Sequence, residues 1–388
     1  MSGSSNPLHL AVALEGTGWH PASWREPDAR PAELLTPGYW VDLVTEAERG
    51  LVDFITIEDG LTLQFDNPLH ADDRTDRVRG RLDAVLIASR VAPRTRHIGL
   101  LPTVVVTHTE PFHASKAIAT LDYVSSGRAG VRVQVTASED AARHFGRRSV
   151  PESGDAGELI AEAADYVEVI RRLWDSWEDD AEIRDVTTGR FIDRNKLHYI
   201  DFDGPRFSVK GPSITPRPPQ GQPVVAALGH GEAAHGLIAS SADVGFITPH
   251  DTAEAASIAG VLAAHRDGEA VRVFADLVVF LDGKADAAKA RKAHLDDALG
   301  REYVSDAEVF VGTPGELADL LQQWHEAGVD GFRLRPATVP HDLLQITNGV
   351  VPELQARGAF RTSYPGTTLR DTLGLARPAN RYSTAATS

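Results

Sequence analysis

The chain has 388 residues, which is enough for one large domain or two ordinary ones. Its 39 basic and 55 acidic residues give a net charge of −16, which disfavours nucleic acids and anionic membranes as partners. It contains no cysteine, which excludes disulfides and thiolate metal sites. No apolar run approaches the roughly 18 residues of a membrane span, and the amino terminus does not resemble a secretory signal. We therefore expect a cytoplasmic protein.

Short apolar segments alternate with amphipathic ones along the chain. The sequence predicts eight strands, at residues 8–14, 53–58, 98–106, 129–135, 223–228, 244–248, 273–281 and 331–336. It predicts helices between them, at residues 39–49, 82–91, 112–125, 159–177, 253–266 and 315–327. Eight strand–helix units favour an α/β fold of the (β/α)₈ TIM-barrel type. A doubly wound sheet is the alternative, but the first strand is followed by EGTGWHPASWREP and not by a glycine-rich phosphate turn.

Four connections are longer than usual, and the tail differs in composition from the rest. The long connections are residues 15–36, 60–80, 178–222 and 283–313. Loops of this length are typical of functional or disordered segments. The first two leave strand ends directly, so we expect a lid at the carboxyl-terminal face of the barrel. The third follows a helix and has the pattern of a hairpin. We predict one barrel domain over residues 1–360 and a carboxyl-terminal extension over 361–388. The small, polar end of that extension, residues 376–388, is expected to fray or to wrap a partner subunit.

Polar side chains alternate with valines in the fourth predicted strand. Arg132, Gln134 and Thr136 share one face, because side chains on a strand alternate with period two. Polar groups that point into a barrel cost free energy of desolvation unless they meet a partner or a ligand. This face is therefore either a satisfied polar layer inside the barrel or one wall of a pocket for a flat polar ligand.

Two histidines and one glycine-rich turn are further site candidates. His108 and His113 are separated by a proline, so they do not form a helical metal pair, and we predict no metal site. His113 is interpreted as a helix residue. The turn ALGHGEAAHG at residues 227–236 links a strand to a helix. It is either a plain tight turn or a phosphate-binding turn with free backbone N–H groups.

Six segments in order resemble the bacterial-luciferase-like flavin monooxygenases, in particular the nitrilotriacetate and alkane-sulfur monooxygenase branch. They are GWHPASWREP, FITIEDG, THTEPFHASKAIATLDYVSSGRAG, ADYVEVIRRLWDSWEDDA, RPPQGQPVV and YPGTTLRDTLGL. The resemblance implies a homodimer or homotetramer that uses reduced FMN from a separate NAD(P)H:flavin reductase. It implies reaction of the flavin with O₂ to a flavin peroxide, which oxygenates a small organic substrate. The protein would position the ring and exclude water from it.

The resemblance also implies roles for individual residues. His20 and His108 are the candidate acid–base groups, since imidazole titrates near neutral pH. We expect His108→Ala to lower turnover far more than flavin affinity. The cofactor-binding residues implied are Asp59, Thr107, Arg132, Gln134, Thr136, Gly229, His230 and Gly231.

Several positions depart from the family pattern. Arg132 stands where relatives usually carry Asn, and Val131 where they carry Trp. Ile160 and Gly231 stand where relatives place Tyr and Ser on the flavin phosphate, so backbone N–H groups at the 229–231 turn would have to compensate. Two other functions therefore stay open. One is a deazaflavin-dependent hydride-transfer enzyme on the same barrel, and the other is a catalytically reduced subunit that binds flavin or a small molecule.

Overall fold

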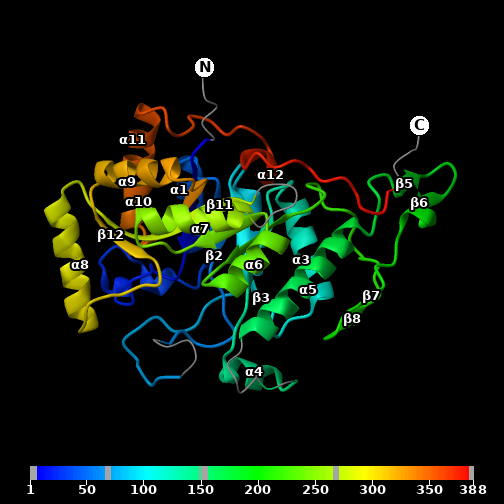
Figure 1. Ribbon diagram of the computed structural model, residues 1–388, viewed down its shortest axis with the longest axis horizontal. Helices are drawn as coiled ribbons and strands as arrows, with labels where there is room; N and C mark the ends of the chain where they lie inside the picture. The colour runs from blue at the N-terminus through cyan, green and yellow to red at the C-terminus, as the bar shows by residue number, and fades with distance from the viewer. Residues whose placement is uncertain (1–6, 66–70, 148, 150–155, 265–270, 384–388) are drawn as a thin grey trace.

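The computed structural model is a closed barrel of eight parallel strands, described over residues 7–65, 71–147, 149, 156–264 and 271–383 (Figure 1). Strands pair with their neighbours in chain order, and the barrel closes where β1 pairs with β13. This confirms the predicted TIM barrel. The barrel strands are β1 (His9–Leu14), β2 (Phe54–Ile57), β3 (Gly99–Val105), β4 (Gly130–Gln134), β9 (Val224–Leu228), β10 (Val244–Ile247), β11 (Arg272–Leu281) and β13 (Gly331–Pro336).

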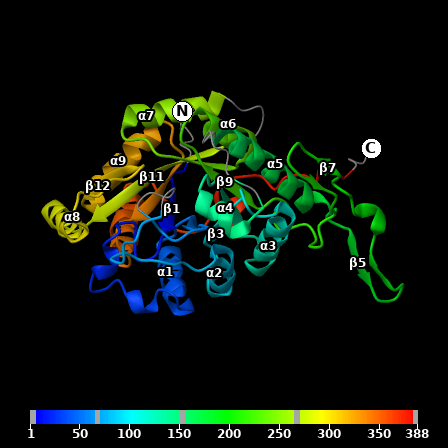
Figure 2. The same cartoon turned by 90° about the horizontal axis from the view of Figure 1, so that it is seen from below.

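The helices surround the barrel, as the view into its mouth shows (Figure 2). The main ones are α1 (Pro37–Arg49), α2 (Ala84–Val91), α3 (Pro111–Val124), α5 (Ala156–Asp175), α6 (Glu232–Ser241), α7 (Thr252–Ala264) and α9 (Pro314–Glu326). The start of α9 is fixed by a capping box, in which the Thr313 hydroxyl and the Glu316 carboxylate each accept a backbone N–H at the helix start. Three short helical pieces complete the ring: α10 (His341–Gln345), the π-helix η5 (Ile346–Val350) and α11 (Val351–Ala356).

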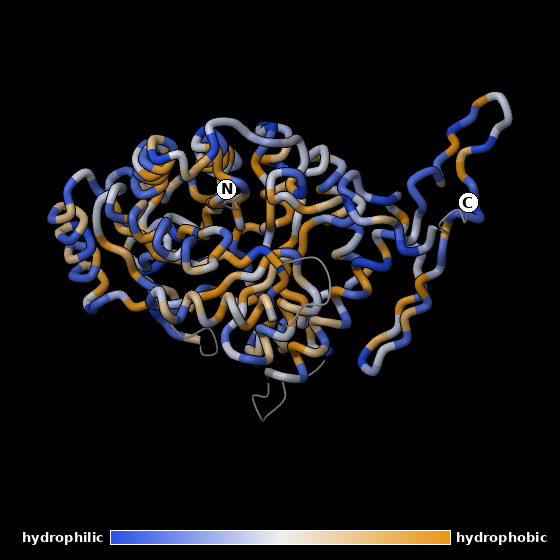
Figure 3. Tube along the Cα trace, turned by 45° about the horizontal axis from the view of Figure 1, so that its top comes forward, coloured by the Kyte–Doolittle hydropathy of each residue, from blue (hydrophilic) through white to orange (hydrophobic). Residues whose placement is uncertain are grey.

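Two insertions carry more regular structure than the sequence indicated. The 283–313 insertion, expected as a long connection, contains α8 (Ala285–Leu299) and a ninth strand, β12 (Glu308–Gly312), which pairs with the end of β11. The predicted hairpin in 178–222 is in fact two hairpins, β5 (Glu182–Asp185) with β6 (Arg190–Ile192), and β7 (Phe202–Asp203) with β8 (Ser208–Val209). They project from one side of the barrel (Figures 1 and 3). A short helix after β4, α4 (Glu139–Phe145), was not predicted.

The carboxyl-terminal extension packs firmly on the barrel, so the expectation of a frayed end is wrong for residues 376–383. Its helix α12 (Leu369–Thr372) lies at the end of the barrel opposite α4 (Figure 1). Leu369 and Leu373 are fully buried in the apolar cluster at the amino-terminal end of the barrel interior. Arg370 pairs with buried Asp243 at 3.0 Å, and the Asn380 amide donates to the carbonyls of Asp175 and Trp177. Residues 384–388 lie outside the described residues.

Candidate functional site

A cavity of about 320 Å³ opens at the carboxyl ends of β1 to β4, and we call it the mouth cavity. This volume lies within the range of small-molecule sites, about 300–1,000 Å³. Its apolar walls include Trp19, Phe65 and Val105. The polar side chains that line it are Glu15, Glu58, Asp59, Thr62, Gln64, Arg81, Gln134 and Thr136. The barrel therefore has a pocket where TIM-barrel enzymes place their active sites.

Two further cavities border this region. The side cavity, about 230 Å³, lies next to the mouth cavity. The two cavities share four lining residues, Glu15, Trp19, Gln64 and Phe65. The side cavity is also lined by His20. The outer cavity, about 160 Å³, lies between the start of α3, the end of α4 and the middle of α5, and it contains His108.

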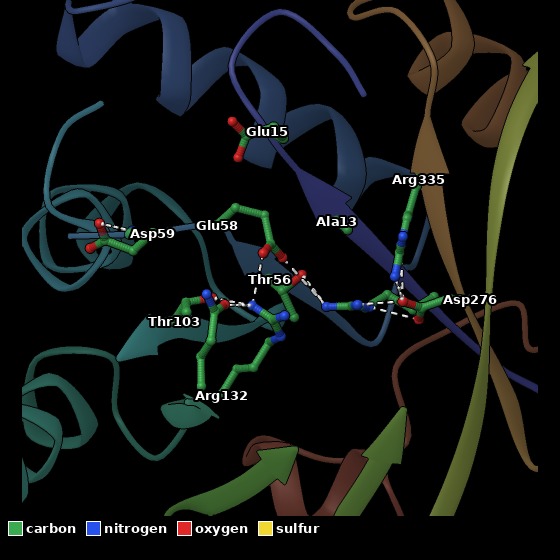
Figure 4. A network of polar contacts seen from close by, with 12 residues as sticks. Ala13, Glu15, Thr56, Glu58, Asp59, Thr103, Arg132, Asp276 and Arg335 are labelled. Atoms are coloured by element: carbon green, nitrogen blue, oxygen red, sulfur yellow. Dashed lines mark hydrogen bonds and ion pairs between the residues drawn. The ribbon is translucent and has the colours of Figure 1, made fainter. Parts of the chain in front are cut away.

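A layer of buried charged side chains forms the floor beneath the mouth cavity (Figure 4). Nη1 of Arg132 donates to Glu58 at 2.7 Å, to Thr103 at 2.9 Å and to Gln134 at 2.9 Å. Glu58 is also 3.4 Å from Arg333. Arg132 is 5 % exposed, and burial lowers the pKa of its guanidinium while Glu58 raises it.

The layer continues across the barrel through Asp276. This fully buried carboxylate accepts hydrogen bonds from both Arg333 and Arg335. Burial alone would raise its pKa, but the two guanidinium groups hold the pKa of Asp276 below its usual range. Arg335 extends to Asp306 at 2.6 Å and stacks on the Trp19 ring, with its guanidinium carbon 4.5 Å from the ring centroid. The floor is thereby connected to a wall of the cavity.

The three carboxylates that line the mouth cavity all have partners within the protein. Glu15 pairs with Arg81 at 2.6 Å, and burial raises its pKa against the effect of that arginine. Glu58 belongs to the charged layer. Asp59 accepts the N–H groups of Gly60 at 2.7 Å and Ala84 at 2.9 Å, and burial raises its pKa. The cavity is therefore not a simple trap for a cationic ligand.

The predicted cofactor residues on or just after β2, β3 and β4 do not all line the mouth cavity. Asp59, Gln134 and Thr136 line the mouth cavity. Arg132 lies beneath them in the charged layer, where its Nη1 is hydrogen-bonded and its Nε is buried without a partner among the described residues. Thr107 lines the outer cavity, and its hydroxyl accepts the Thr136 N–H at 2.9 Å, so this bond separates the two spaces.

His20 is fully buried and both of its ring nitrogens are occupied. Nδ1 accepts the Ala22 N–H at 3.1 Å, which places the proton on Nε2, 3.2 Å from a carboxylate oxygen of Asp296. Burial lowers the pKa of His20 to about 4, although Asp296 acts in the opposite direction. The side chain is therefore a neutral imidazole at neutral pH that ties helix α8 to the segment after β1.

His108 is buried in the outer cavity, away from the mouth cavity. Its ring stacks on Phe145 of α4, with ring centroids 5.4 Å apart. In the same cavity the hydroxyl groups of Thr109 and Tyr166 are 3.1 Å apart. The structure thus places the two candidate acid–base histidines in different cavities. His113 is exposed on α3, as expected.

The 229–231 turn does not border any of these three cavities. The Gly229 N–H is already bonded to the Phe246 carbonyl at 3.0 Å. His230 is exposed and contacts Thr248 at 3.1 Å and Asp306 at 3.4 Å. Gly231 precedes α6 with a φ of 81°, which explains glycine at this position. The turn therefore stays a candidate phosphate-binding turn only through its backbone N–H groups. His230 connects it to the charged layer, because Asp306 contacts both His230 and Arg335.

Sequence reasoning missed most of the charged layer. Asp276 interrupts an otherwise apolar strand, and Arg333 and Arg335 alternate with Phe332 and Leu334. This is the same alternation that marked Arg132 on β4, so the signal was present. The role of Arg81 had no such signal, because only folding brings it to the end of β1.

Two kinds of potential site are not found within the described residues. In that part of the chain, no helix is long and apolar enough to cross a membrane. Nor do its histidine, aspartate and glutamate residues form a group of three or more that could hold a metal ion.

Comparison with known proteins adds relatives that match nearly the whole chain. Residues 20–331 match the family described as luciferase-like monooxygenase. The chain is 31% identical to N-acetyl-S-(2-succino)cysteine monooxygenase of Bacillus subtilis, with 98% of this chain and 100% of that protein aligned. It is also 31% identical to nitrilotriacetate monooxygenase component A of Aminobacter aminovorans, with 97% and 98% aligned.

Solved structures agree on the fold. The crystal structure of a long-chain alkane monooxygenase superposes with a TM-score of 0.83 at 24% identity, covering 95% of each chain. An EDTA monooxygenase from Chelativorans superposes with a TM-score of 0.81 at 22% identity, covering 96% of this chain and 99% of the other. At these identities the likeness shows the fold alone.

Proposed function

Because this chain belongs to the luciferase-like monooxygenase family of flavin-dependent enzymes, we propose that it is the oxygenating component of a two-component system. In this proposal it binds reduced FMN, supplied by a separate NAD(P)H:flavin reductase, and uses O₂ to oxygenate a small organic substrate. A homodimer or homotetramer in the cytoplasm is part of the proposal. The relative named as component A of nitrilotriacetate monooxygenase supports the two-component assignment.

The observation that carries the proposal is the mouth cavity at the ends of β1 to β4. A flavin ring needs apolar walls and a few fixed hydrogen-bonding groups, and this cavity supplies both. Trp19, Phe65 and Val105 provide apolar surface, while the Gln134 amide and the Thr136 hydroxyl provide polar contacts. The residues present therefore fit the cofactor. When bound, reduced FMN supplies the electrons that activate O₂, and the surrounding walls exclude water.

His20 and His108 take different parts in this proposal. His20 borders the side cavity, which adjoins the mouth, but its neutral and doubly bonded ring favours a role in orienting that wall. His108 lies beyond the Thr107–Thr136 bond. We propose that His108 acts on turnover only if the two spaces join when ligand binds. His108→Ala tests this: if the two cavities join, the variant should lose turnover while its affinity for flavin stays unchanged.

Two other functions compete with this one. Structures of coenzyme F420-dependent enzymes share the barrel, one with a TM-score of 0.60 at 14% identity, which supports the fold alone. The relatives at 31% identity are named monooxygenases, which favours oxygenation over deazaflavin hydride transfer. A subunit with reduced catalysis would bind flavin and give no product.

The test is binding and turnover by the purified chain. Photoreduced FMN should bind in anaerobic ultrafiltration, and addition of ¹⁸O₂ with a reductase should label the product. Nitrilotriacetate and N-acetyl-S-(2-succino)cysteine are the first substrates to try. No binding of either redox form at high micromolar flavin would exclude the proposal. Binding without turnover on a wider substrate panel would favour the non-catalytic subunit, and selective binding of a deazaflavin would favour hydride transfer.

A further inference from the structure

We propose that Arg132 is a positioning residue: it fixes the Gln134 amide so that the N–H₂ group, and not the oxygen, faces the mouth cavity. The inference rests on the proposed function only in taking the ligand to be a flavin. It gives a reason for a buried arginine on a barrel strand, and it assigns a specific hydrogen-bonding role to the residue two positions further along.

The orientation of Gln134 follows from the chemistry of its neighbour. Nη1 of Arg132 lies 2.9 Å from Oε1 of Gln134. A guanidinium group has donors and no acceptor, so the amide can only present its oxygen to it. The amide nitrogen then points the other way. Gln134 is half-buried and lines the mouth cavity, and within the described residues its Nε2 makes no hydrogen bond to another group.

Arg132 is held firmly enough to impose this orientation. It is 5 % exposed, and the same nitrogen also donates to Glu58 at 2.7 Å and to Thr103 at 2.9 Å. Its Nε is buried with no hydrogen-bond partner in the described part of the chain, which is a cost that a loosely placed side chain would avoid. Glu58 is shared with Arg333, which is held in turn by Asp276. Arg132 cannot move away without leaving a buried carboxylate short of a partner.

The consequence for the ligand is a wall that donates hydrogen bonds. The carboxylates of the cavity are engaged by Arg81, by Arg132 with Arg333, and by backbone N–H groups. At Gln134 a ligand therefore meets N–H₂, and it must offer an acceptor there. The C2 and C4 carbonyl oxygens of a flavin are such acceptors. They carry more electron density in the reduced ring, so this wall favours the reduced cofactor.

A double-mutant cycle on flavin binding tests the inference, with photoreduced FMN as the probe in anaerobic ultrafiltration. Gln134→Leu should weaken binding about tenfold, the value of one well-placed hydrogen bond. Arg132→Met should weaken it several-fold, because the amide can then turn over. The double variant should bind no more weakly than Gln134→Leu alone, since Arg132 acts through Gln134. Losses that multiply in the double variant would overturn the inference, because they would mean that Arg132 contacts the ligand itself.

Gln134→Glu keeps the test decisive if Arg132→Met does not fold. The carboxylate still accepts from Arg132, but it presents an oxygen to the cavity where the amide presented N–H₂. Binding should fall at least as far as in Gln134→Leu, and unchanged binding would overturn the inference. The two proposals fail separately. If the wild type binds neither redox form of FMN, the proposed function is wrong. If it binds FMN and the Gln134 variants bind equally well, only this inference is wrong.

Discussion

At the amino-terminal end of the barrel, inward-facing side chains are aromatic and aliphatic, whereas further along the same strands they are charged. On β2 the inward positions run from Phe54 to Thr56, and Glu58 follows just after the strand; on β11 Phe274 is followed by Asp276. The amino-terminal end of the barrel is closed by the carboxyl-terminal extension, while the carboxyl-terminal end opens into cavities. The amino-terminal half of the barrel stabilises the fold by removing apolar surface from water. In the carboxyl-terminal half, holding polar groups in fixed places costs folding free energy.

The largest effect is expected from Asp276→Leu, which removes the central carboxylate of the charged layer. Arg333 and Arg335 would then share a buried site without their main counter-charge. Breaking a buried pair in this way costs about 3–5 kcal/mol of unfolding free energy. Urea unfolding of the variant measures this. The matched variant, with Arg333→Met added, should recover part of the loss, and a further drop would contradict this account of the layer.

At the other end, Leu373→Ala should destabilise without touching the site. Leu373 is fully buried beside Leu369 in the apolar cluster, and truncating such a side chain costs about 2–5 kcal/mol. The midpoint of denaturation should fall while affinity for FMN stays within twofold of the wild type. Exposed Leu86 on α2 is the control, because Leu86→Ala should change stability by no more than about 0.5 kcal/mol. Loss of FMN affinity in Leu373→Ala would show that the two ends are coupled.

The pH dependence of stability should reveal the contribution of His20, which lies at the carboxyl-terminal end of the barrel. Its pKa is about 4 in the folded protein, so the unfolded chain takes up a proton first as the pH falls. The stability that depends on neutral His20 is therefore present above about pH 6.5 and is lost as the pH falls towards 4. It amounts to on the order of 3 kcal/mol. Lys292 and Arg301 oppose protonation of the ring, and Asp296 favours it.

His20→Asn is the variant that measures this term. The Asn side-chain oxygen can accept the Ala22 N–H in place of Nδ1, and the residue does not titrate. The difference in unfolding free energy between wild type and variant should shrink from pH 7 to pH 4. A difference that stays constant over this range would show that His20 has the same pKa in the folded and unfolded protein, which would contradict its burial as a neutral ring.

The two halves also differ in how far the sequence predicted them. Most of the eight barrel strands follow from apolar runs bounded by turns, because a parallel strand is buried on both faces, whereas β4 and β13 alternate polar and apolar residues. The alternation of Arg132 with Val131 and Val133 left two interpretations open. The structure places Arg132 in a polar layer inside the barrel, with Nη1 paired and Nε unpaired among the described residues, and it places Gln134 and Thr136 in the cavity lining. Pairings such as Glu15 with Arg81, 66 residues apart, depend on how an insertion folds over the mouth. The ninth strand, β12, was missed although Val309, Phe310 and Val311 favour a strand, because it lies inside the segment interpreted as one long connection, residues 283–313.

The smallest effect on stability is expected where the charged layer meets the cavity, at Trp19. Its indole N–H donates to the Ala13 carbonyl at 2.9 Å, and Arg335 stacks on its ring. Trp19→Phe removes the hydrogen bond and part of the cation–π attraction, for a loss of about 1 kcal/mol in unfolding free energy. Yet Trp19 lines both the mouth cavity and the side cavity, so affinity for reduced FMN should fall several-fold. Thermal unfolding and anaerobic FMN titration of the same sample give both numbers. If stability fell by several kcal/mol while flavin affinity held, Trp19 would belong with the packed amino-terminal half of the barrel, and the division between a stabilising end and a binding end would have to be redrawn at β1.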